Sequence, residues 1–274
     1  MASRSKARPV PRRGAAALER LWQPARERPE PSPPAGRVPR GRPARLDTAL
    51  VVKAALALAD AGGPAALTLP RVARALGCTT MSLYRHVGSK EEFLALVVDA
   101  AIGPPAGAAG AGTGWRDGLR RWALAERAVY RRRPWVARLP ITGPPLGPNQ
   151  VGWMEDALRA LRGTGLHWGE KLGVLMLVSG YVRQSALLEA DLAGGEAAEA
   201  ARRYPGALAR VIDRARFPET TQLLASGVLE SSRSQSYDDG DFQFGLDRIL
   251  DGADLVVRRR RPDGPGRARR RTTN

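Results

Sequence analysis

The stretch LTLPRVARALGCTTMSLYRHVGSKEEF, residues Leu67–Phe93, decides the fold of this chain. Its pattern predicts a short helix that starts at Thr68, a tight turn at Gly77, and a second short helix capped by Thr79 or Thr80. Threonine is a favoured N-cap, proline suits the first turn of a helix, and glycine adopts the left-handed conformation common at helix ends. Two short helices around a glycine-containing turn form the helix-turn-helix motif, which binds DNA.

Helices are also expected on both sides of this motif. Ser89 followed three residues later by Glu92 forms a capping box, so a further helix starts there and runs to Gly103. Before the motif, apolar residues at helical spacing predict a helix over Leu46–Ala59 that braces the two short helices. Residues 46–103 are therefore expected to form one small helical head.

The ordered residues of this head resemble the DNA-binding domain of the tetracycline-repressor (TetR) family of bacterial transcription regulators. The matching positions are Leu67-Thr68, Val72-Ala73, Leu76-Gly77, Leu83-Tyr84, His86-Val87 and Ser89-Lys90-Glu91. Further along, FQFGLDRILDG and the segment 147–166 resemble the tetracycline-repressor-like C-terminal domain of the same family. The resemblance is good over 46–103, looser over 115–257 and absent from both ends of the chain.

The resemblance implies that the second helix of the motif reads DNA bases. The DNA-contacting residues that it implies are Thr68, Thr79, Thr80, Met81, Ser82, Tyr84, Arg85, His86 and Lys90. Hydroxyl groups, an arginine and an apolar methionine suit base edges, phosphates and a thymine methyl group. Tyr84 and His86 are also compatible with purely structural roles, whereas Leu83 and Val87 are expected in the core. Pro70 departs from the pattern, because the tetracycline repressor has a DNA-contacting arginine there.

The formal net charge of +17 is concentrated at the two ends of the chain. Residues 1–45 hold 12 Lys or Arg against 3 Asp or Glu, and residues 258–274 hold 8 Arg against 1 Asp. The rest of the chain therefore carries a net charge of only +1, and bulk charge hardly supports DNA binding by the head. Both ends are expected to be disordered, either as arms that strengthen phosphate contact or as extensions without a role.

Between these ends we expect an all-α fold in two parts. The three-helix, helix-turn-helix DNA-binding head at 46–103 is joined by a flexible Gly/Ala-rich linker at 104–114 to a larger helical bundle at 115–257. The longest expected helix, Trp168 to Asp191, is apolar nearly all round over part of its length, which indicates burial in the core or against a partner. A break is expected near Tyr204-Pro205-Gly206.

The family resemblance implies that the larger part binds a small molecule and forms the dimer. Aromatic and flexible side chains suit a ligand pocket, although each is also compatible with core packing. The candidate pocket residues are Trp122, Tyr130, Trp135, Trp153, Met154, His167, Met176, Tyr181 and Gln184. The resemblance also implies a four-helix bundle between two subunits that involves the last helix, with Leu246, Ile249, Leu250 and Ala253 at the dimer interface.

Several other classes of protein do not fit. Cys78 is the single cysteine, so neither an intramolecular disulfide nor a cysteine metal cluster is expected. No apolar run is long enough to span a membrane, and no secretion signal is recognisable, which indicates the cytoplasm. The two histidines, His86 and His167, lie in different parts, and no catalytic or phosphate-binding motif appears. We therefore expect no enzyme activity, no cofactor and no bound metal.

The sequence thus predicts a homodimeric, sequence-specific regulator of transcription, released from a pseudo-palindromic operator in double-stranded DNA by a small-molecule effector. Two alternatives remain open at this point. The same fold can be regulated by protein partners without a ligand, or the basic ends can make a nucleoid-type binder without sequence preference.

Overall fold

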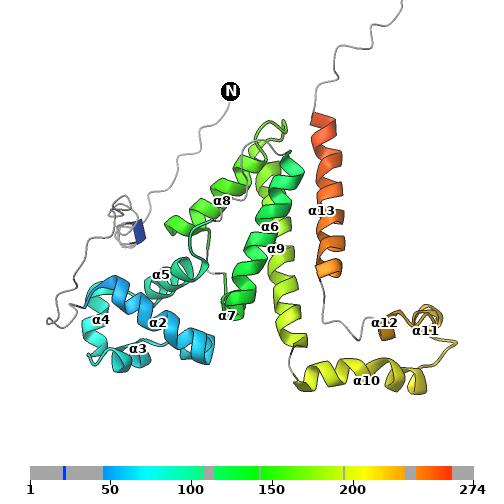
Figure 1. The fold of residues 1–274 in the computed structure, drawn as a ribbon, viewed down its shortest axis with the longest axis horizontal. Coiled ribbons are helices and arrows are strands. Elements are labelled where there is room, and N and C mark those ends of the chain that lie inside the picture. The colour runs from blue at the N-terminus through cyan, green and yellow to red at the C-terminus, as the bar shows by residue number, and fades with distance from the viewer. Residues whose placement is uncertain are drawn as a thin grey trace, which may run out of the picture. The chain divides into compact units, whose positions relative to one another are not determined.

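The computed structural model describes residues 21–22, 46–105, 107, 114–141, 143–193, 195–231 and 239–260. The regular structure of these residues is helical, which confirms the all-α prediction (Figure 1). The chain divides into two compact units. The head unit contains the described residues up to Pro105 together with 138–155, and the body unit contains the rest.

The head unit is built on the helices that the sequence predicts. They are α2 (Thr48–Gly62), α3 (Leu69–Ala75), α4 (Thr80–Val87) and α5 (Lys90–Ile102). A 3-10 helix that was not predicted, η1 (Pro64–Ala66), lies between α2 and α3. α2 starts two residues later than expected, because Asp47 is the N-cap and its carboxylate accepts from the Leu50 N–H at 2.7 Å. Gly63, with φ of 68°, follows the end of α2 in the left-handed region that glycine tolerates.

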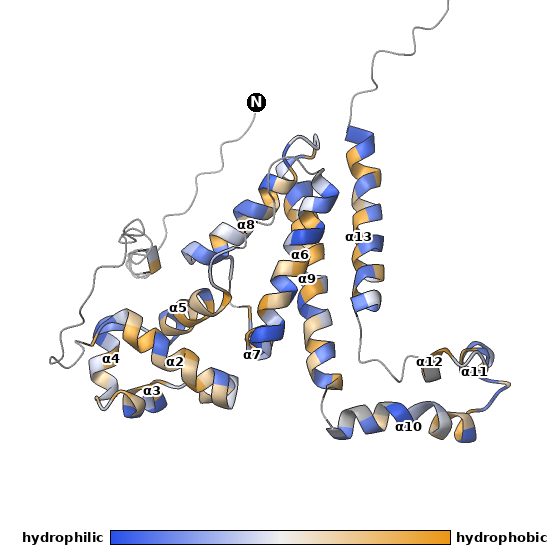
Figure 2. Ribbon diagram, viewed as in Figure 1, coloured by the Kyte–Doolittle hydropathy of each residue, from blue (hydrophilic) through white to orange (hydrophobic). Residues whose placement is uncertain are grey.

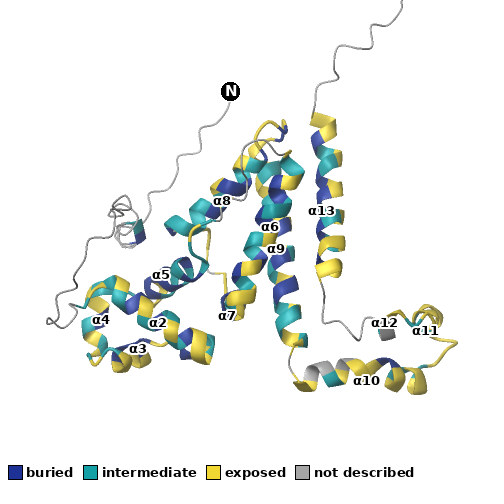
Figure 3. Cartoon of the chain, in the orientation of Figure 1, coloured by how far each residue is buried: buried dark blue, intermediate teal, exposed yellow. Residues whose placement is uncertain are grey.

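The core of the head unit lies where α2 packs against α3, α4 and α5. Its buried apolar side chains are Val51, Val52, Ala55, Ala59, Leu69, Val72, Ala73, Leu83, Val87, Phe93, Leu96, Val97 and Ala101. Figure 2 shows apolar positions on these helices, and Figure 3 marks the buried ones. A fully buried leucine or phenylalanine contributes about 1.5–3 kcal/mol, so this small core can hold the motif helices in place.

A segment outside the expected head also belongs to the head unit. The buried Asp99 carboxylate near the end of α5 accepts from the Gln150 N–H at 2.9 Å and from Asn149 Nδ2 at 3.0 Å. Trp153 Nε1 donates to the Gly103 carbonyl at 3.0 Å. The sequence places residues 138–155 in the larger domain, but these contacts join the segment to α5. α8 (Pro148–Ala160) is therefore divided between the two units.

Two residues of the N-terminal extension also lie in the head unit. Leu21 and Trp22 are helical, and they fall in the piece from Ala15 to Trp22 for which the sequence allows a transient helix within the expected disordered extension. Leu21 is buried, and Trp22 Nε1 donates to the Leu146 carbonyl at 3.0 Å. The other residues of this extension, and most of the expected linker at 104–114, lie outside the described residues.

Long helices form the body unit. They are α6 (Trp115–Arg132), α7 (Pro134–Arg138), α9 (Trp168–Leu192), α10 (Gly195–Val211), α11 (Pro218–Ala225), α12 (Val228–Ser231) and α13 (Asp239–Arg260). α10 runs without the expected break, with Pro205 inside it. α13 ends at Arg260, so the first three residues of the expected disordered tail at 258–274 are helical. The remaining tail residues lie outside the described part of the chain.

α6, α9 and α13 pack side by side and make the core of the body unit (Figure 1). α6 and α9 bury apolar side chains between them, and α13 adds the buried Phe242, Leu246 and Leu250. Ion pairs link the surfaces of these helices: Arg116 to Asp251 at 2.6 Å, Arg120 to Asp247 at 2.7 Å and Arg260 to Glu170 at 2.7 Å. By contrast, the described residues of α10 and α11 are mostly exposed (Figure 3).

Candidate DNA-binding surface and effector site

α4 is held in place by its own N-cap and by its apolar face. The Thr79 hydroxyl accepts from the Ser82 N–H at 3.2 Å, which resolves the expected cap in favour of Thr79 over Thr80. Leu83 and Val87 are fully buried, as expected for core residues. Thr48 Oγ1 donates to the His86 carbonyl at 3.2 Å and ties the C-terminal end of α4 to α2. The helix can therefore present one fixed face to a ligand.

The opposite face of α4 is open to solvent. Met81 is 73% exposed, Tyr84 is 39% exposed, and Arg85 is also exposed. Thr80, Ser82 and His86 are partly buried. An apolar group, a phenol and a guanidinium on one helix face can meet a thymine methyl, a phosphate and a guanine edge, respectively.

The helix starts next to α4 complete this surface. Lys90 is exposed in the first turn of α5, where Ser89 Oγ accepts from the Glu92 N–H at 3.1 Å. Backbone N–H groups at this helix start lower the pKa of the exposed Glu91 carboxyl, with a further contribution from Ser89. Thr68 stands at the N-cap position of α3, but its side chain makes no capping hydrogen bond. Both helix starts thus favour an anion such as phosphate.

The turn between α3 and α4 shows why the motif needs its glycine. Gly77 has φ of 64°, and the next residue, Cys78, donates its N–H to the Ala73 carbonyl at 3.0 Å. The Pro70 ring sits in the first turn of α3 and is exposed. The surface around α4 therefore has no arginine where the tetracycline-repressor pattern expects one.

The predicted effector residues fall in both units of the chain. Trp122 and Trp135 are buried in the body unit, and Tyr130 is half-buried there. Trp153 is buried in the head unit, and Met154 is in the same segment. His167, Met176 and Gln184 are exposed, and their place in a ligand pocket stays a prediction.

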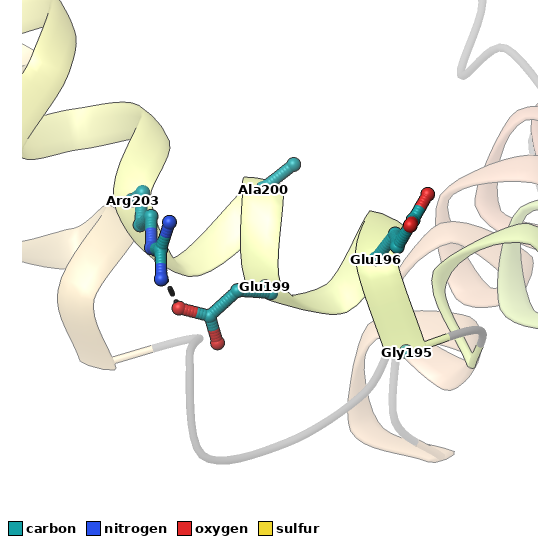
Figure 4. A pocket seen from close by; sticks show the side chains of 5 residues that line it. All are labelled: Gly195, Glu196, Glu199, Ala200 and Arg203. Atoms are coloured by element: carbon teal, nitrogen blue, oxygen red, sulfur yellow. Dashed lines mark ion pairs between the residues drawn. The ribbon is translucent and has the colours of Figure 1, made fainter.

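A hollow on the surface of α10 lies apart from these residues. It measures about 560 Å³ and is open to solvent along α10 (Figure 4). Its lining residues are Gly195, Glu196, Glu199, Ala200 and Arg203. Glu199 and Arg203 form an ion pair at 2.7 Å, and Glu196 adds a second acidic side chain. None of these residues belongs to the predicted pocket.

A polar group that the sequence analysis did not assign lies inside the α6–α9 contact. Glu126 Oε1 accepts from Ser179 Oγ at 2.8 Å and weakly from the Tyr130 hydroxyl at 3.4 Å. Burial of the carboxyl end raises the Glu126 pKa to about 7, against the opposing effect of the two hydroxyls. Burial also raises the pKa of the Tyr130 hydroxyl, with a further contribution from Glu126. The four-residue spacing of Trp122, Glu126 and Tyr130 was the available sequence signal.

A second polar group fixes α13 to α6 and α9. The buried Arg127 pairs with Asp239 at 2.9 Å and with Glu189 at 3.3 Å. Its guanidinium carbon lies 4.2 Å from the ring centroid of Phe242, which stacks on Tyr181 at 5.4 Å. Tyr181, predicted as a pocket residue, also donates to the Phe242 carbonyl at 3.0 Å. This group is a helix-packing element with a desolvated cation at its centre.

The predicted dimer residues pack mainly within one protomer. Leu246, Leu250 and Ala253 are buried within the protomer, where α13 meets α6 and α9, and Ile249 is half-buried. These side chains are largely shielded within one chain, and their contact with a second chain stays a prediction. The apolar side chains that α13 exposes are Phe244 and Leu255, at 67% and 61%.

A helix-turn-helix with a solvent-facing second helix, on a separate helical body, defines a DNA-binding transcription regulator. Comparison with known protein families agrees with this class of protein. Residues 51–97 match bacterial regulatory proteins of the tetR family, and residues 106–257 match the tetracyclin repressor-like C-terminal domain. The chain belongs to the TetR family.

Individual relatives support this assignment. The HTH-type transcriptional repressor DrrR1 of Streptomyces coeruleorubidus is 36% identical over 250 residues, covering 89% of this chain and 87% of that protein. Apo ActR from Streptomyces coelicolor superposes with a TM-score of 0.66 at 28% identity, covering 78% of this chain and 97% of ActR. ActR in complex with actinorhodin gives a TM-score of 0.65, with the same identity and coverage.

Regulators of this family bind operator DNA as dimers and respond to small-molecule effectors. This protein is accordingly a helix-turn-helix regulator of transcription. Among the described residues, no helix is long and apolar enough to cross a membrane.

Proposed function

We propose that this protein is a homodimeric repressor that binds a pseudo-palindromic operator and leaves it when a small molecule binds the body unit. The observation that carries the proposal is the division of α4 into a buried face, with Leu83 and Val87, and an exposed face, with Tyr84 and Arg85. A helix anchored on one side and chemically varied on the other suits insertion into the major groove.

The proposed DNA contacts divide into two kinds. Met81, Tyr84 and Arg85 face solvent along α4 and are assigned to base edges and adjacent phosphates. Thr68, Thr79 and Lys90 lie at helix starts, where backbone N–H groups favour phosphate, and are assigned to the DNA backbone. Thr80, Ser82 and His86 are partly buried, and we assign them to supporting contacts.

For the dimer we propose the exposed face of α9 in place of the buried face of α13. Trp168, Leu172 and Met176 recur every four residues and are 69%, 43% and 73% exposed. Leu177 extends this stripe at 63%. Glycines at 169, 173 and 180 are exposed nearby, so two such helices can approach closely. The exposed Phe244 of α13 is the proposed partner of this stripe.

The repressor and effector assignments rest on relatives. DrrR1 is named a transcriptional repressor, and ActR has been described with bound actinorhodin and with bound (S)-DNPA. Release by a ligand requires that the ligand bind the DNA-free conformation more tightly than the DNA-bound one. We place the protein in the cytoplasm, where bacterial operator DNA lies.

The proposal is tested by selecting binding sites from a random double-stranded DNA library with the full chain. We expect enrichment of a pseudo-palindrome whose half-sites lie about one helical turn apart. Fluorescence anisotropy then compares the selected duplex with a shuffled one. Binding without any enriched sequence would replace the proposal with a nucleoid-type binder.

Effector release is measured by adding compounds to the protein–operator complex, with actinorhodin as the first probe because ActR holds it. When an effector releases the protein, the anisotropy of the operator duplex falls in proportion to the fraction of protein that holds effector. An operator complex that resists compounds but dissociates with a protein partner would favour the ligand-independent alternative.

A further inference from the structure

The contact between α6 and α9, the most extensive helix contact in the body unit, contains a carboxyl group that its surroundings do not satisfy. Glu126 Oε1 accepts from Ser179 Oγ at 2.8 Å and from the Tyr130 hydroxyl at 3.4 Å. Oε2 is buried and has no hydrogen-bond partner among the described residues. A buried polar atom without a partner costs stability, so its presence calls for an explanation.

Helix packing does not provide that explanation. The hydrogen-bond partners of the Glu126 carboxyl are two neutral hydroxyls, so no cation bonds directly to an ionised form. The next residue, Arg127, is directed to Glu189 and Asp239. Arg183, one turn after Ser179 on α9, donates to the Ala137 carbonyl through Nε at 2.9 Å and Nη2 at 2.8 Å.

The surroundings of Glu126 match those of a ligand site in composition. Trp122, one turn earlier on α6, is 3% exposed, and Val178 and Val182 of α9 are fully buried. Small-molecule sites combine apolar and aromatic walls with a few polar groups that fix orientation. Glu126, Tyr130 and Ser179 supply three such groups within one turn of each helix.

We propose that Glu126, Tyr130 and Ser179 form the recognition point for an effector whose hydroxyl or ammonium group donates a hydrogen bond to Glu126 Oε2. The proposal rests on the ligand-released repressor function and names the chemical class of its ligand. Oε2 is buried, so a ligand that reaches it shifts the side chains between α6 and α9. The ligand therefore binds a conformation distinct from the ligand-free one, as release from DNA requires.

The first test uses the stability of the ligand-free protein. Glu126→Leu removes the unsatisfied carboxyl and keeps an apolar side chain in the contact. If Glu126 serves a ligand, this variant melts about 2–4 °C higher than wild type. Glu219→Leu, at an exposed position of α11, is the matched control and leaves the melting temperature unchanged. A lower melting temperature for Glu126→Leu shows a structural role and overturns the proposal.

The second test uses three probes on one aromatic frame: 2-naphthol, 2-naphthylmethylammonium and 2-methylnaphthalene. Calorimetric titration of wild type should show that at least one of the two donor compounds binds about tenfold more tightly than the methyl compound, as one hydrogen bond to a carboxylate allows. Glu126→Leu should abolish that preference. Equal affinity for all three, no binding of either donor compound, or a preference that survives in Glu126→Leu contradicts the proposal.

Glu126→Gln separates the two donor types. Glutamine keeps an acceptor oxygen and loses the negative charge, so a preference for the naphthol survives in this variant and a preference for the ammonium compound is lost. Operator anisotropy keeps this inference distinct from the proposed function. Glu126→Leu should bind operator like wild type. If the protein binds its operator but the probe titrations contradict the proposal, only the ligand assignment is refuted. A wild-type protein without a preferred operator refutes the repressor function itself.

Discussion

At the scale of single residues, Arg85 offers the sharpest test of how the head reads DNA. It is exposed on α4 between the buried Leu83 and Val87. Arg85→Ala should weaken binding to the selected operator by about 1–3 kcal/mol if the guanidinium pairs with a base, and should hardly affect a shuffled duplex. Fluorescence anisotropy at fixed salt measures the affinity for the operator and for the shuffled duplex.

Arg210→Ala is the control, because Arg210 is exposed on α10 in the other unit. This variant changes the net charge equally and should leave operator affinity unchanged. A uniform loss for operator and shuffled DNA on Arg85→Ala would assign Arg85 to the phosphate backbone. Tyr84→Ala, measured in the same way, separates its DNA-contacting role from a purely structural one.

Glu126 should make stability depend on pH. Its folded pKa of about 7 lies above the ordinary value of 4.5, because burial disfavours the ionised carboxylate. Below pH 4.5 the group is protonated in both states and imposes no penalty. As the pH rises from 4.5 to about 7, the unfolded chain releases its proton first, so this contribution falls by on the order of 3 kcal/mol.

Urea unfolding at pH 5 and pH 8 measures this effect. Glu126→Gln cannot titrate, so the difference in unfolding free energy between wild type and this variant should change across that interval. Glu219→Gln, at an exposed position, is the control and should follow wild type. A pH dependence that is identical in wild type and Glu126→Gln would show that the carboxyl is ionised and solvated in the folded chain.

At the scale of elements, the junction between α5 and the start of α8 depends on a glycine. A Cβ on Gly147 would lie 2.1 Å from Asp99 Oδ1, the atom that accepts from the Gln150 N–H. Gly147→Ala should therefore lower stability by about 1–3 kcal/mol, because either the carboxylate or the loop must move. Thermal unfolding measures this loss of stability. Gly143→Ala is the control, since a Cβ there meets nothing within 4 Å.

The two apolar faces of the late helices should respond differently to charge. Met176→Lys lies on the exposed stripe of α9 and should give a folded monomer, because a lysine there opposes close approach of a second chain. Leu246→Lys places a charge in the protomer core and should unfold the chain. Sedimentation velocity distinguishes monomer from dimer, and circular dichroism distinguishes folded from unfolded protein.

Val211→Lys, at a 78% exposed position on α10, is the control for added charge and should remain dimeric. An unchanged dimer on Met176→Lys would place the interface on another surface, such as the exposed face of α13. The periodicity of α13 identified its apolar side correctly, but periodicity alone could not distinguish a face buried within one chain from a face buried between two.

At the scale of the whole molecule, the basic ends should affect binding strength rather than specificity. Residues 1–20 carry 6 Lys or Arg against 1 Glu, and residues 261–274 carry 5 Arg against 1 Asp. Deleting both segments should reduce the salt dependence of DNA affinity, since each lost phosphate contact lowers the slope of log K against log salt by about 0.9. The selected operator sequence should stay the same.

Anisotropy titrations between 50 and 200 mM salt measure that slope, over about the range in which such contacts are resolved. The deletion removes neither the buried Leu21 nor the helical Arg260, so both residues keep their packing contacts. Loss of operator preference in the truncated protein would move sequence recognition from α4 to the ends of the chain.

The sequence by itself determined the order of the head helices, the Ser89 cap, the Gly77 turn and the burial of Leu83 and Val87. It narrowed the cap of α4 to Thr79 or Thr80, and the structure selected Thr79. These features follow from interactions between residues a few positions apart, which a linear pattern records. Tertiary structure decided which face of α13 fills the core, and it brought Glu126 to Ser179 from 53 residues away. Such contacts depend on how whole helices pack, and no local spacing encodes them.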